Sequence, residues 1–215
     1  MPSGPGESPD ERASGSAPSA EPDASRERLL EAVRAEVVES GLDKLSATSV
    51  ARRAGLARIT LYRRGGDVKR LALTALTRET ETIIVRATRD LPDGSGRDRL
   101  VELALRLVKG VAASDLVRAL VGADTTLLAP YLTEHLGTSQ RALVAAATPD
   151  LQRGMGDGSV RRADHHTIGT VLVQALTPFA LGSGVAVGEL GQPVVDAEIR
   201  RLVDGYLRPS EAPAP

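Results

Sequence analysis

The chain has 215 residues, with 28 acidic and 27 basic side chains and a formal net charge of −1 at pH 7. Hydrophobic residues make up 41% of it, enough for a core, but aromatic residues only 2%, which favours packed helices over a sandwich of aromatic-rich strands. There is no cysteine. This excludes disulfides, thiol catalysis and cysteine-ligated metal sites, and it is typical of a reducing cytoplasm.

Both ends have the composition of loose segments. Residues 1–24 are rich in Pro, Gly and Ser, lack the apolar core of a secretion signal, and carry five acidic residues against one basic residue. We therefore expect a disordered acidic tail over 1–24 and a loose C-terminus over 209–215. Between them we expect a DNA-binding domain over 25–70 and a ligand-binding and dimerisation domain over 71–208.

Helix signals follow one another closely in the first third of the chain. Ser25 is a suitable N-cap for a helix that ends at Gly41, and Ser46 for a second, short helix. Gly55 supplies the turn after it, because a positive φ is least costly at glycine. A third helix is expected over 57–63.

Gly65 and Gly66 end that helix, and Asp67 is expected to cap a fourth. Further helices are expected over residues 97–113, 114–121, 124–147, 165–180 and 193–207, with glycine-rich loops at 154–158 and 182–188. Pro178 should kink its helix or mark its last turn. With no convincing strand and no internal repeat, the sequence predicts an all-α fold.

One apolar stretch requires a membrane test. Residues 167–188 contain no charge and are long enough to span a bilayer. They also hold Gln174, Pro178 and several glycines, and they lack interfacial aromatic anchors and a flanking basic cluster. We expect a buried helix followed by a loop, and no membrane partner.

Positive charge is concentrated in one short segment. Residues 46–70 carry seven basic side chains and a single acid, Asp67, in a chain of almost balanced charge. The same segment has the helix–turn–helix pattern, in which the second helix enters the major groove of DNA. The alternative is a solvated basic surface without a partner.

Each residue type in this segment suits one kind of DNA contact. The apolar positions Val50, Ala51, Ala54, Leu56 and Leu61 can fix the angle between the two helices. Ser46, Thr60 and Tyr62 can bind phosphate oxygens, which carries no sequence information. Arg58 can pair with guanine O6 and N7 and so specify a base, whereas Arg63 and Arg64 suit either role.

Residues 26–76 resemble the N-terminal domain of TetR-type transcriptional repressors. The matching positions are Leu45-Ser46, Val50-Ala51, Ala54-Gly55-Leu56 and Thr60-Leu61-Tyr62-Arg63, followed by a helix that opens at Asp67. The resemblance implies a three-helix operator-binding domain, a larger helical domain that binds a small effector, and a homodimer.

By this resemblance, Ser46 and Thr48 lie where phosphate contacts arise, Ala57 and Arg58 at variable base-reading positions, and Thr60 and Tyr62 at phosphate-contacting positions. The sequence departs from the family at Arg64-Gly65, where an aromatic residue is common. It also has Val68 where the family often has lysine, with Lys69 next to it as a substitute phosphate contact.

The C-terminal half carries two apolar stripes at helical spacing. They comprise Ile168, Val171, Leu172, Ala175, Leu176 and Phe179, and then Ile199, Leu202, Val203 and Tyr206. Such stripes require a covering surface, which is either the subunit's own core or a second subunit. We expect dimerisation. Tyr131, His135 and Gln174 are the polar candidates for ligand binding.

Other functions find less support in the residues. Adjacent His165 and His166 do not share a helix face, so no metal site is expected; the alternative is a helix start with Asp164 near its positive end. The glycines of 182–188 are wrongly spaced for a dinucleotide loop. No catalytic constellation and no cofactor motif is found, so we predict a cytoplasmic repressor released from operator DNA by a small molecule. The alternatives are a constitutive DNA-binding protein and an all-helical enzyme.

Overall fold

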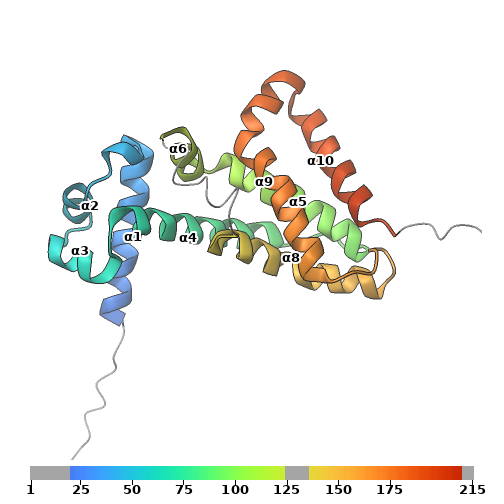
Figure 1. Cartoon of the computed structure of the whole chain (residues 1–215), viewed down its shortest axis with the longest axis horizontal. Coiled ribbons are helices and arrows are strands. Elements are labelled where there is room, and N and C mark those ends of the chain that lie inside the picture. The colour runs from blue at the N-terminus through green and yellow to red at the C-terminus, as the bar shows by residue number, and fades with distance from the viewer. Residues whose placement is uncertain (1–19, 124–135, 210–215) are drawn as a thin grey trace, which may run out of the picture.

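A computed structural model of the chain describes residues 20–123 and 136–209. Within these ranges every regular element is a helix, which confirms the all-α prediction. The elements are α1 (Ala20–Ser40), the 3-10 helix η1 (Leu42–Lys44), α2 (Ala47–Arg53), α3 (Arg58–Gly65), α4 (Val68–Thr88), α5 (Gly96–Ala113), α6 (Asp115–Ala123), α8 (Thr138–Gly156), α9 (His165–Leu190) and α10 (Gln192–Leu207). Figure 1 shows α1, α2 and α3 as a small group at one end, with α4 running from it into a larger helical body.

The turns of the small N-terminal group form as their residue types predict. The Ser46 side chain caps α2 by accepting a hydrogen bond from the Ser49 backbone N–H over 3.1 Å. Asp67 caps α4 by accepting from the Arg70 N–H over 2.8 Å. Gly55 has φ 65°, the left-handed conformation that glycine adopts without a steric penalty. These predictions are confirmed.

The N-terminal core extends beyond the helices of the small group. Val33 and Val37 of α1, Val50 of α2 and Leu61 of α3 are fully buried together. The first turns of α4 join this core, and so do Leu116 and Leu120 of α6, which are fully buried in it. The predicted boundary at residues 70 and 71 therefore falls inside a continuous helix whose start belongs to the N-terminal core.

The C-terminal core lies between α5, α8, α9 and α10. Its buried residues include Leu100, Leu105, Val108, Leu151, Val160, Ile168, Leu172, Leu176, Val195, Ile199, Val203 and Leu207. The start of α5 approaches the end of α8 so closely that a Cβ on Gly96 would lie 2.2 Å from the Gly154 nitrogen. Glycine is therefore required at this crossing.

The predicted loop at residues 182–188 is wrong, because α9 continues through it to Leu190. Glycine lowers helix stability by about 1 kcal/mol relative to alanine. Here Ala186 and Val187 of the same stretch pack against the C-terminal core, which offsets that weakness. Pro178 consequently lies inside α9 and does not mark its last turn.

Two further boundaries differ from the expected ones. Helix α1 begins at Ala20, so the expected cap Ser25 lies inside the helix and is buried. Helix α8 begins at Thr138 and runs past Pro149 to Gly156, which removes part of the expected loop at 154–158. Residues 124–135, where another helix start was expected, lie outside the described residues.

Helix α9 is long and apolar enough to cross a membrane by length and composition alone. A core helix passes the same test, but only one face of α9 is buried in the single chain, so the expected buried helix is found in part. Ile168, Leu172 and Leu176 are buried against α5 and α10 residues of the C-terminal core.

Candidate nucleic-acid interface

A tight turn joins α2 to α3 and fixes their relative orientation. The Leu56 N–H donates to the Ala51 carbonyl over 2.9 Å, and the Gly55 N–H donates to the Arg52 carbonyl over 3.2 Å. Val50 and Leu61, one from each helix, are fully buried in the N-terminal core. The two helices thus form a helix–turn–helix whose opposite faces are free for a partner.

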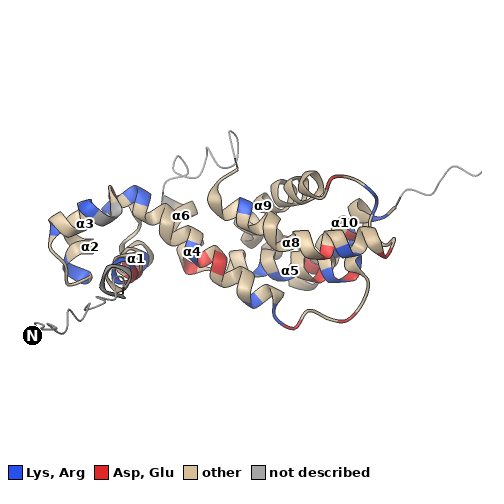
Figure 2. Cartoon of the chain, turned by 90° about the horizontal axis from the view of Figure 1, so that it is seen from below, with Lys and Arg blue, Asp and Glu red and all other residues tan. Residues whose placement is uncertain are grey.

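The outer face of α3 is basic and exposed. Arg58, Tyr62 and Arg63 are exposed, and the Tyr62 side chain is 50% accessible. Figure 2 shows Lys and Arg residues gathered over α2, α3 and the start of α4, at one end of the molecule. This arrangement places guanidinium and phenol groups together on the helix that would enter a major groove.

The other expected DNA contacts surround this face. Ser46 and Thr48 are exposed at the start of α2, Ala57 is the exposed N-cap of α3, and Lys69 is exposed in the first turn of α4. Thr60 is half-buried on α3. The side chain of Arg64 lies outside the described residues.

Arg53 is an exception among the basic residues of the segment. Its guanidinium bonds to Glu36 and Glu39 of α1, with Nε 2.9 Å from Glu36 Oε2 and one terminal nitrogen 2.9 Å from Glu39 Oε1. The hydrogen bond from Arg53 lowers the pKa of Glu39, and the same bond raises the pKa of Arg53. Arg53 therefore joins α2 to α1 and adds little positive charge to the outer face.

Ile59 is a surface feature that the sequence reasoning missed. It lies on α3 beside Arg58 and is 67% exposed. An apolar side chain on a reading helix can contact the methyl group of thymine. The helical spacing could have predicted this exposure, because Leu61 rather than Ile59 falls on the inward side of α3.

The joint between α3 and α4 is closed without an aromatic residue. Val68 is partly buried and packs against the N-terminal core beside Leu71 and Ala72, which are buried. Gly66 has φ 71° and allows the chain to turn into the Asp67 cap. The sequence departs from the family pattern at Arg64-Gly65, where an aromatic residue is common, and at Val68, where lysine is common. Val68 supplies apolar packing at this joint and so compensates for the missing aromatic residue.

Comparisons with known proteins agree with this geometry. No protein-family model matches the chain. It is 28% identical over 181 residues to an uncharacterized HTH-type transcriptional regulator of Mycobacterium tuberculosis, a match that covers 84% of this chain and 93% of that protein. It is also 36% identical over 78 residues to the HTH-type regulator AqdR of Rhodococcus erythropolis, covering 36% of this chain and 35% of that protein.

Solved structures share the whole architecture. The TetR-family repressor QsdR of R. erythropolis superposes with a TM-score of 0.64 at 20% identity, covering 88% of this chain and 99% of that one. RolR in complex with resorcinol superposes with a TM-score of 0.66 at 16% identity, covering 87% and 89%. The chain has the TetR-family fold. The resemblance to TetR-type repressors predicted from the sequence is thus confirmed for the fold, and the relatives found are named as transcriptional regulators.

Within this TetR-family fold, a partly open cavity of about 600 Å³ lies between α1, α4, α5, α6, α8 and α9. Gln174, a predicted ligand residue, lies on α9 but is not part of the described cavity wall. Its neighbour Val173 does line the cavity. The other two candidates, Tyr131 and His135, lie outside the described residues. The polar wall residues that the sequence did not indicate include Thr77, Ser139 and Gln140.

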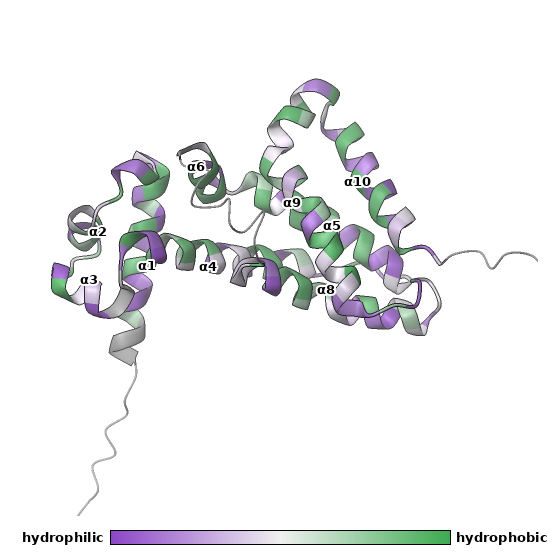
Figure 3. Ribbon diagram, viewed as in Figure 1, coloured by the Kyte–Doolittle hydropathy of each residue, from purple (hydrophilic) through white to green (hydrophobic). Residues whose placement is uncertain are grey.

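The two apolar stripes divide between the core and the surface. Leu172, Leu176, Ile199 and Val203 are buried inside the single chain, whereas Val171, Ala175, Phe179 and Leu202 are exposed. Figure 3 shows hydrophobic residues recurring along α9 and α10 out to their junction. The exposed group continues through Val185, Leu190 and Val194, and we call it the α9–α10 patch.

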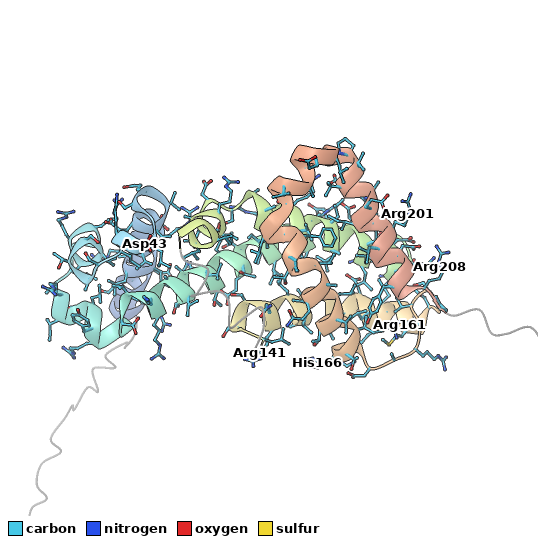
Figure 4. The ribbon with its side chains drawn as sticks, turned by 45° about the horizontal axis from the view of Figure 1, so that its top comes forward. Asp43, Arg141, Arg161, His166, Arg201 and Arg208 are labelled. Atoms are coloured by element: carbon cyan, nitrogen blue, oxygen red, sulfur yellow. The ribbon has the colours of Figure 1, made fainter. Side chains whose placement is uncertain are left out.

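Tyr206 is occupied within its own chain. The guanidinium of Arg161 lies 4.6 Å from the centroid of its ring, and Arg161 Nε donates to the Tyr206 carbonyl over 3.1 Å. Figure 4 shows Arg161 beside the end of α10 and His166 near the start of α9. At that start Asp164 caps α9 by accepting from the Thr167 N–H over 2.8 Å, which confirms the expected helix start. Among the described residues, no cluster of metal-ligating side chains is present.

Polar contacts tie the N-terminal helices of the TetR-family fold to its larger body. Glu79 of α4 accepts a hydrogen bond from Arg34 Nε of α1 over 3.3 Å and one from Ser114 Oγ over 2.7 Å, just before α6. The adjacent residue, Arg78 of α4, forms an ion pair with Glu27 of α1. Helix α4 therefore bonds to α1 and also forms part of the cavity wall, which includes both Arg78 and Glu27.

Proposed function

We propose that the chain is a homodimeric, cytoplasmic transcriptional repressor that binds double-stranded operator DNA and leaves it when a small-molecule effector fills the cavity. The observation that carries this proposal is the exposed basic face of α3, held on a buried helix–turn–helix core. The resemblance to HTH-type transcriptional regulators over 84% of the chain supports it. QsdR, which shares the fold, is described as a transcriptional repressor.

The DNA-contacting residues divide by chemistry. Ser46, Thr48, Thr60, Tyr62 and Lys69 carry hydroxyl or ammonium groups that suit phosphate oxygens and would position the protein on the duplex.

Arg58 stands in the first turn of α3, where its two parallel N–H groups suit guanine O6 and N7. Ala57 and Ile59 next to it suit the methyl group of thymine. Arg63 and Arg64 follow one turn later and add positive charge for either a phosphate or a base edge.

The α9–α10 patch supports the proposed dimerisation. Val171, Phe179 and Leu202 expose 43%, 39% and 46% of their surface, and apolar residues so grouped on neighbouring helices gain stability when a second copy covers them. Two reading helices related by a two-fold axis would then face successive major grooves, about 34–36 Å apart. The buried members of the two stripes would support this surface from behind.

Release from DNA is proposed to be a shift between two conformations. The cavity wall includes Leu30 and Glu27 of α1 as well as Leu73 and Thr77 of α4. An occupant therefore touches both helices that pack against the helix–turn–helix of α2 and α3. An effector that binds one arrangement of these helices more tightly raises the population of that arrangement. If that arrangement misaligns the reading helices, DNA affinity falls. RolR in complex with resorcinol shows that a protein of this fold accommodates a small molecule.

The test is binding of the full chain to labelled DNA from the region upstream of its own gene, measured by fluorescence anisotropy over a range of salt. We expect tight binding that weakens steeply with salt, since contacts to phosphates release condensed cations. Binding that salt does not affect, or equal affinity for this region and for random DNA at every salt concentration, would contradict an operator. Binding that no small molecule relieves would favour the constitutive alternative.

A further inference from the structure

The inner wall of the cavity is aliphatic. Leu100, Leu103 and Leu107 of α5, Leu143 of α8, and Leu172 and Leu176 of α9 line it. Among the described wall residues none is aromatic. A flat aromatic molecule would therefore find no ring to stack on there, whereas a flexible hydrocarbon can fill a wall of leucine side chains.

Among the described wall residues, charged side chains come from α1 and α4 alone. They are Arg26, Glu27, Arg70, Arg78 and Glu81, and all are exposed. The parts of the described wall that come from α5, α8 and α9 carry no charge. An ionised group on a bound molecule would lose its hydration in that inner part without gaining a counter-charge, which is unfavourable.

Three threonine hydroxyls of the wall donate their hydrogens to backbone carbonyls. Thr77 Oγ1 donates to the Leu73 carbonyl over 3.0 Å, and Thr80 Oγ1 donates to the Leu76 carbonyl over 2.9 Å. On the opposite side, Thr177 Oγ1 of α9 donates to the Val173 carbonyl over 2.6 Å. A hydroxyl that already donates offers only its lone pairs, so these positions present acceptors to the cavity.

A second polar contact fixes this region of the wall. Ser139 Oγ of α8 donates to Thr77 Oγ1 of α4 over 3.3 Å. Gln140 is buried next to it, and its Oε1 accepts from the Gly137 N–H over 2.9 Å. The polar groups at the boundary of α4 and α8 are therefore neutral. Thr77 Oγ1 accepts one bond from Ser139, and a hydroxyl oxygen has a second lone pair that a donor on a ligand can use.

We propose that the cavity binds an uncharged, aliphatic molecule that carries one hydroxyl or amide N–H group, with its chain among the leucines and its donor at Thr77. The proposal rests on the cavity as the effector site of the proposed function and names the chemical class of the effector. It disfavours two classes: carboxylates, whose lone pairs would face those of the threonines, and flat aromatic compounds.

The experiment is calorimetric titration of the full chain with three probes, 1-decanol, decanoate and 2-naphthol, at about pH 8, where decanoate is ionised. We expect 1-decanol to bind at least about tenfold more tightly than either of the others, a difference near 1.4 kcal/mol. Tighter binding of decanoate or of 2-naphthol would overturn the proposal. So would the absence of 1-decanol binding up to its solubility limit.

Matched substitutions localise the donor contact. Thr77→Val keeps the shape of the side chain and removes the oxygen, and we expect it to weaken 1-decanol binding by about fivefold, as for one lost hydrogen bond. Thr82→Val is the control, because Thr82 Oγ1 makes the same kind of bond, to the Arg78 carbonyl over 3.1 Å, but is exposed and outside the cavity wall. Equal effects of the two substitutions would place the probe elsewhere.

A filling substitution provides a test that does not depend on a hydrogen bond. Ala104 lines the cavity from α5 and is partly buried. Ala104→Phe should abolish 1-decanol binding while the variant keeps its helical circular dichroism and its affinity for DNA. Unchanged 1-decanol binding to a folded Ala104→Phe variant would show that the cavity is not the binding site.

DNA binding separates this inference from the proposed function. If 1-decanol binds as described but the chain has no affinity for the upstream DNA, the effector class stands and the repressor function fails. If the chain binds that DNA and the DNA is released by an ionised or aromatic molecule, the function stands and the effector class is wrong.

Discussion

Arg53 Nε of α2 donates to Glu36 Oε2 of α1 over 2.9 Å, and Glu36 is buried. The other side of the same guanidinium binds Glu39. One of the seven basic side chains of segment 46–70 therefore holds the first helix of the helix–turn–helix in place. Its contribution to DNA binding is the position of α2 rather than a phosphate contact.

Arg53→Met tests this role, since methionine retains an unbranched stem and loses the guanidinium. We expect a lower melting temperature, because Glu36 remains buried without its partner, and weaker binding to every DNA sequence by a similar factor. Thermal unfolding and anisotropy titrations measure the two effects. Arg52→Met on the same helix is the control. Arg52 is exposed, so this change should leave the melting temperature unaltered. Equal destabilisation by both substitutions would contradict the proposal that Arg53 holds α2 against α1.

We expect Arg58 to read a base and Tyr62 to contact a phosphate. Arg58→Ala should reduce affinity for the preferred operator by roughly 5- to 150-fold and relax preference at one base pair, as for the loss of a bidentate contact to guanine. Tyr62→Phe should weaken all sequences by about fivefold, as for one lost phosphate hydrogen bond. Selection of bound sequences from a random library checks both. If the two variants select the same sequences as the unaltered chain, the assignment to Arg58 is wrong.

Glu102 links α5 to α10 and makes stability depend on pH. It accepts from Arg106 Nε over 2.8 Å and from Arg200 over 2.7 Å; burial raises its pKa, but these guanidinium bonds outweigh burial and the net pKa is lowered. A carboxylate with a lowered folded pKa stabilises above its unfolded pKa of about 4.3, and the effect is lost as pH falls through the folded value.

Glu102→Gln should therefore lower the free energy of unfolding by about 1–2 kcal/mol at pH 7 and by less as the pH falls below about 4.5. Urea denaturation between about pH 3 and pH 7 measures this difference. Glu198→Gln is the control, because Glu198 is exposed and pairs with Arg201 of its own helix. A constant deficit for Glu102→Gln across the whole range would mean that the charge of Glu102 is not responsible.

The α9–α10 patch predicts the oligomeric state. Leu202→Glu places a charge on an apolar residue that is 46% exposed, and we expect it to raise the dimer dissociation constant by about 30-fold or more. Sedimentation velocity at micromolar concentration detects the shift. Val85→Glu on α4, at a residue 58% exposed and outside the patch, should leave the dimer intact. A monomeric unaltered chain would refute the proposed dimer directly.

Local signals were sufficient where a single residue determines the backbone. Ser46, Gly55 and Asp67 were predicted from residue type alone, because a cap or a positive φ depends on few neighbours. The fold class followed from the same signals repeated along the chain. The same local pattern placed the third helix within a residue of its observed start at Arg58.

The features that the sequence did not predict correctly depend on contacts between distant segments. The glycines of residues 182–188 suggested a loop, but packing of Ala186 and Val187 on the C-terminal core keeps that stretch helical. Segment 46–70 alone could not show that Arg53 has acidic partners on α1. The stripe on α9 was correct as a pattern, yet sequence spacing cannot decide which side meets the subunit's own core, and the structure buries Leu172 while Val171 stays exposed.

Leu116 and Leu120 of α6 have a consequence for protein engineering. Both are fully buried among α1–α4 residues, although they follow those helices by about a whole helix in the chain. A hybrid regulator made by transplanting only the first three helices and part of α4 would carry a hole where these leucines belong. An exchange of the N-terminal helices between relatives would therefore have to move α6 as well, or redesign the residues that it covers. The part of this protein that can be transplanted as a unit is thus discontinuous in sequence.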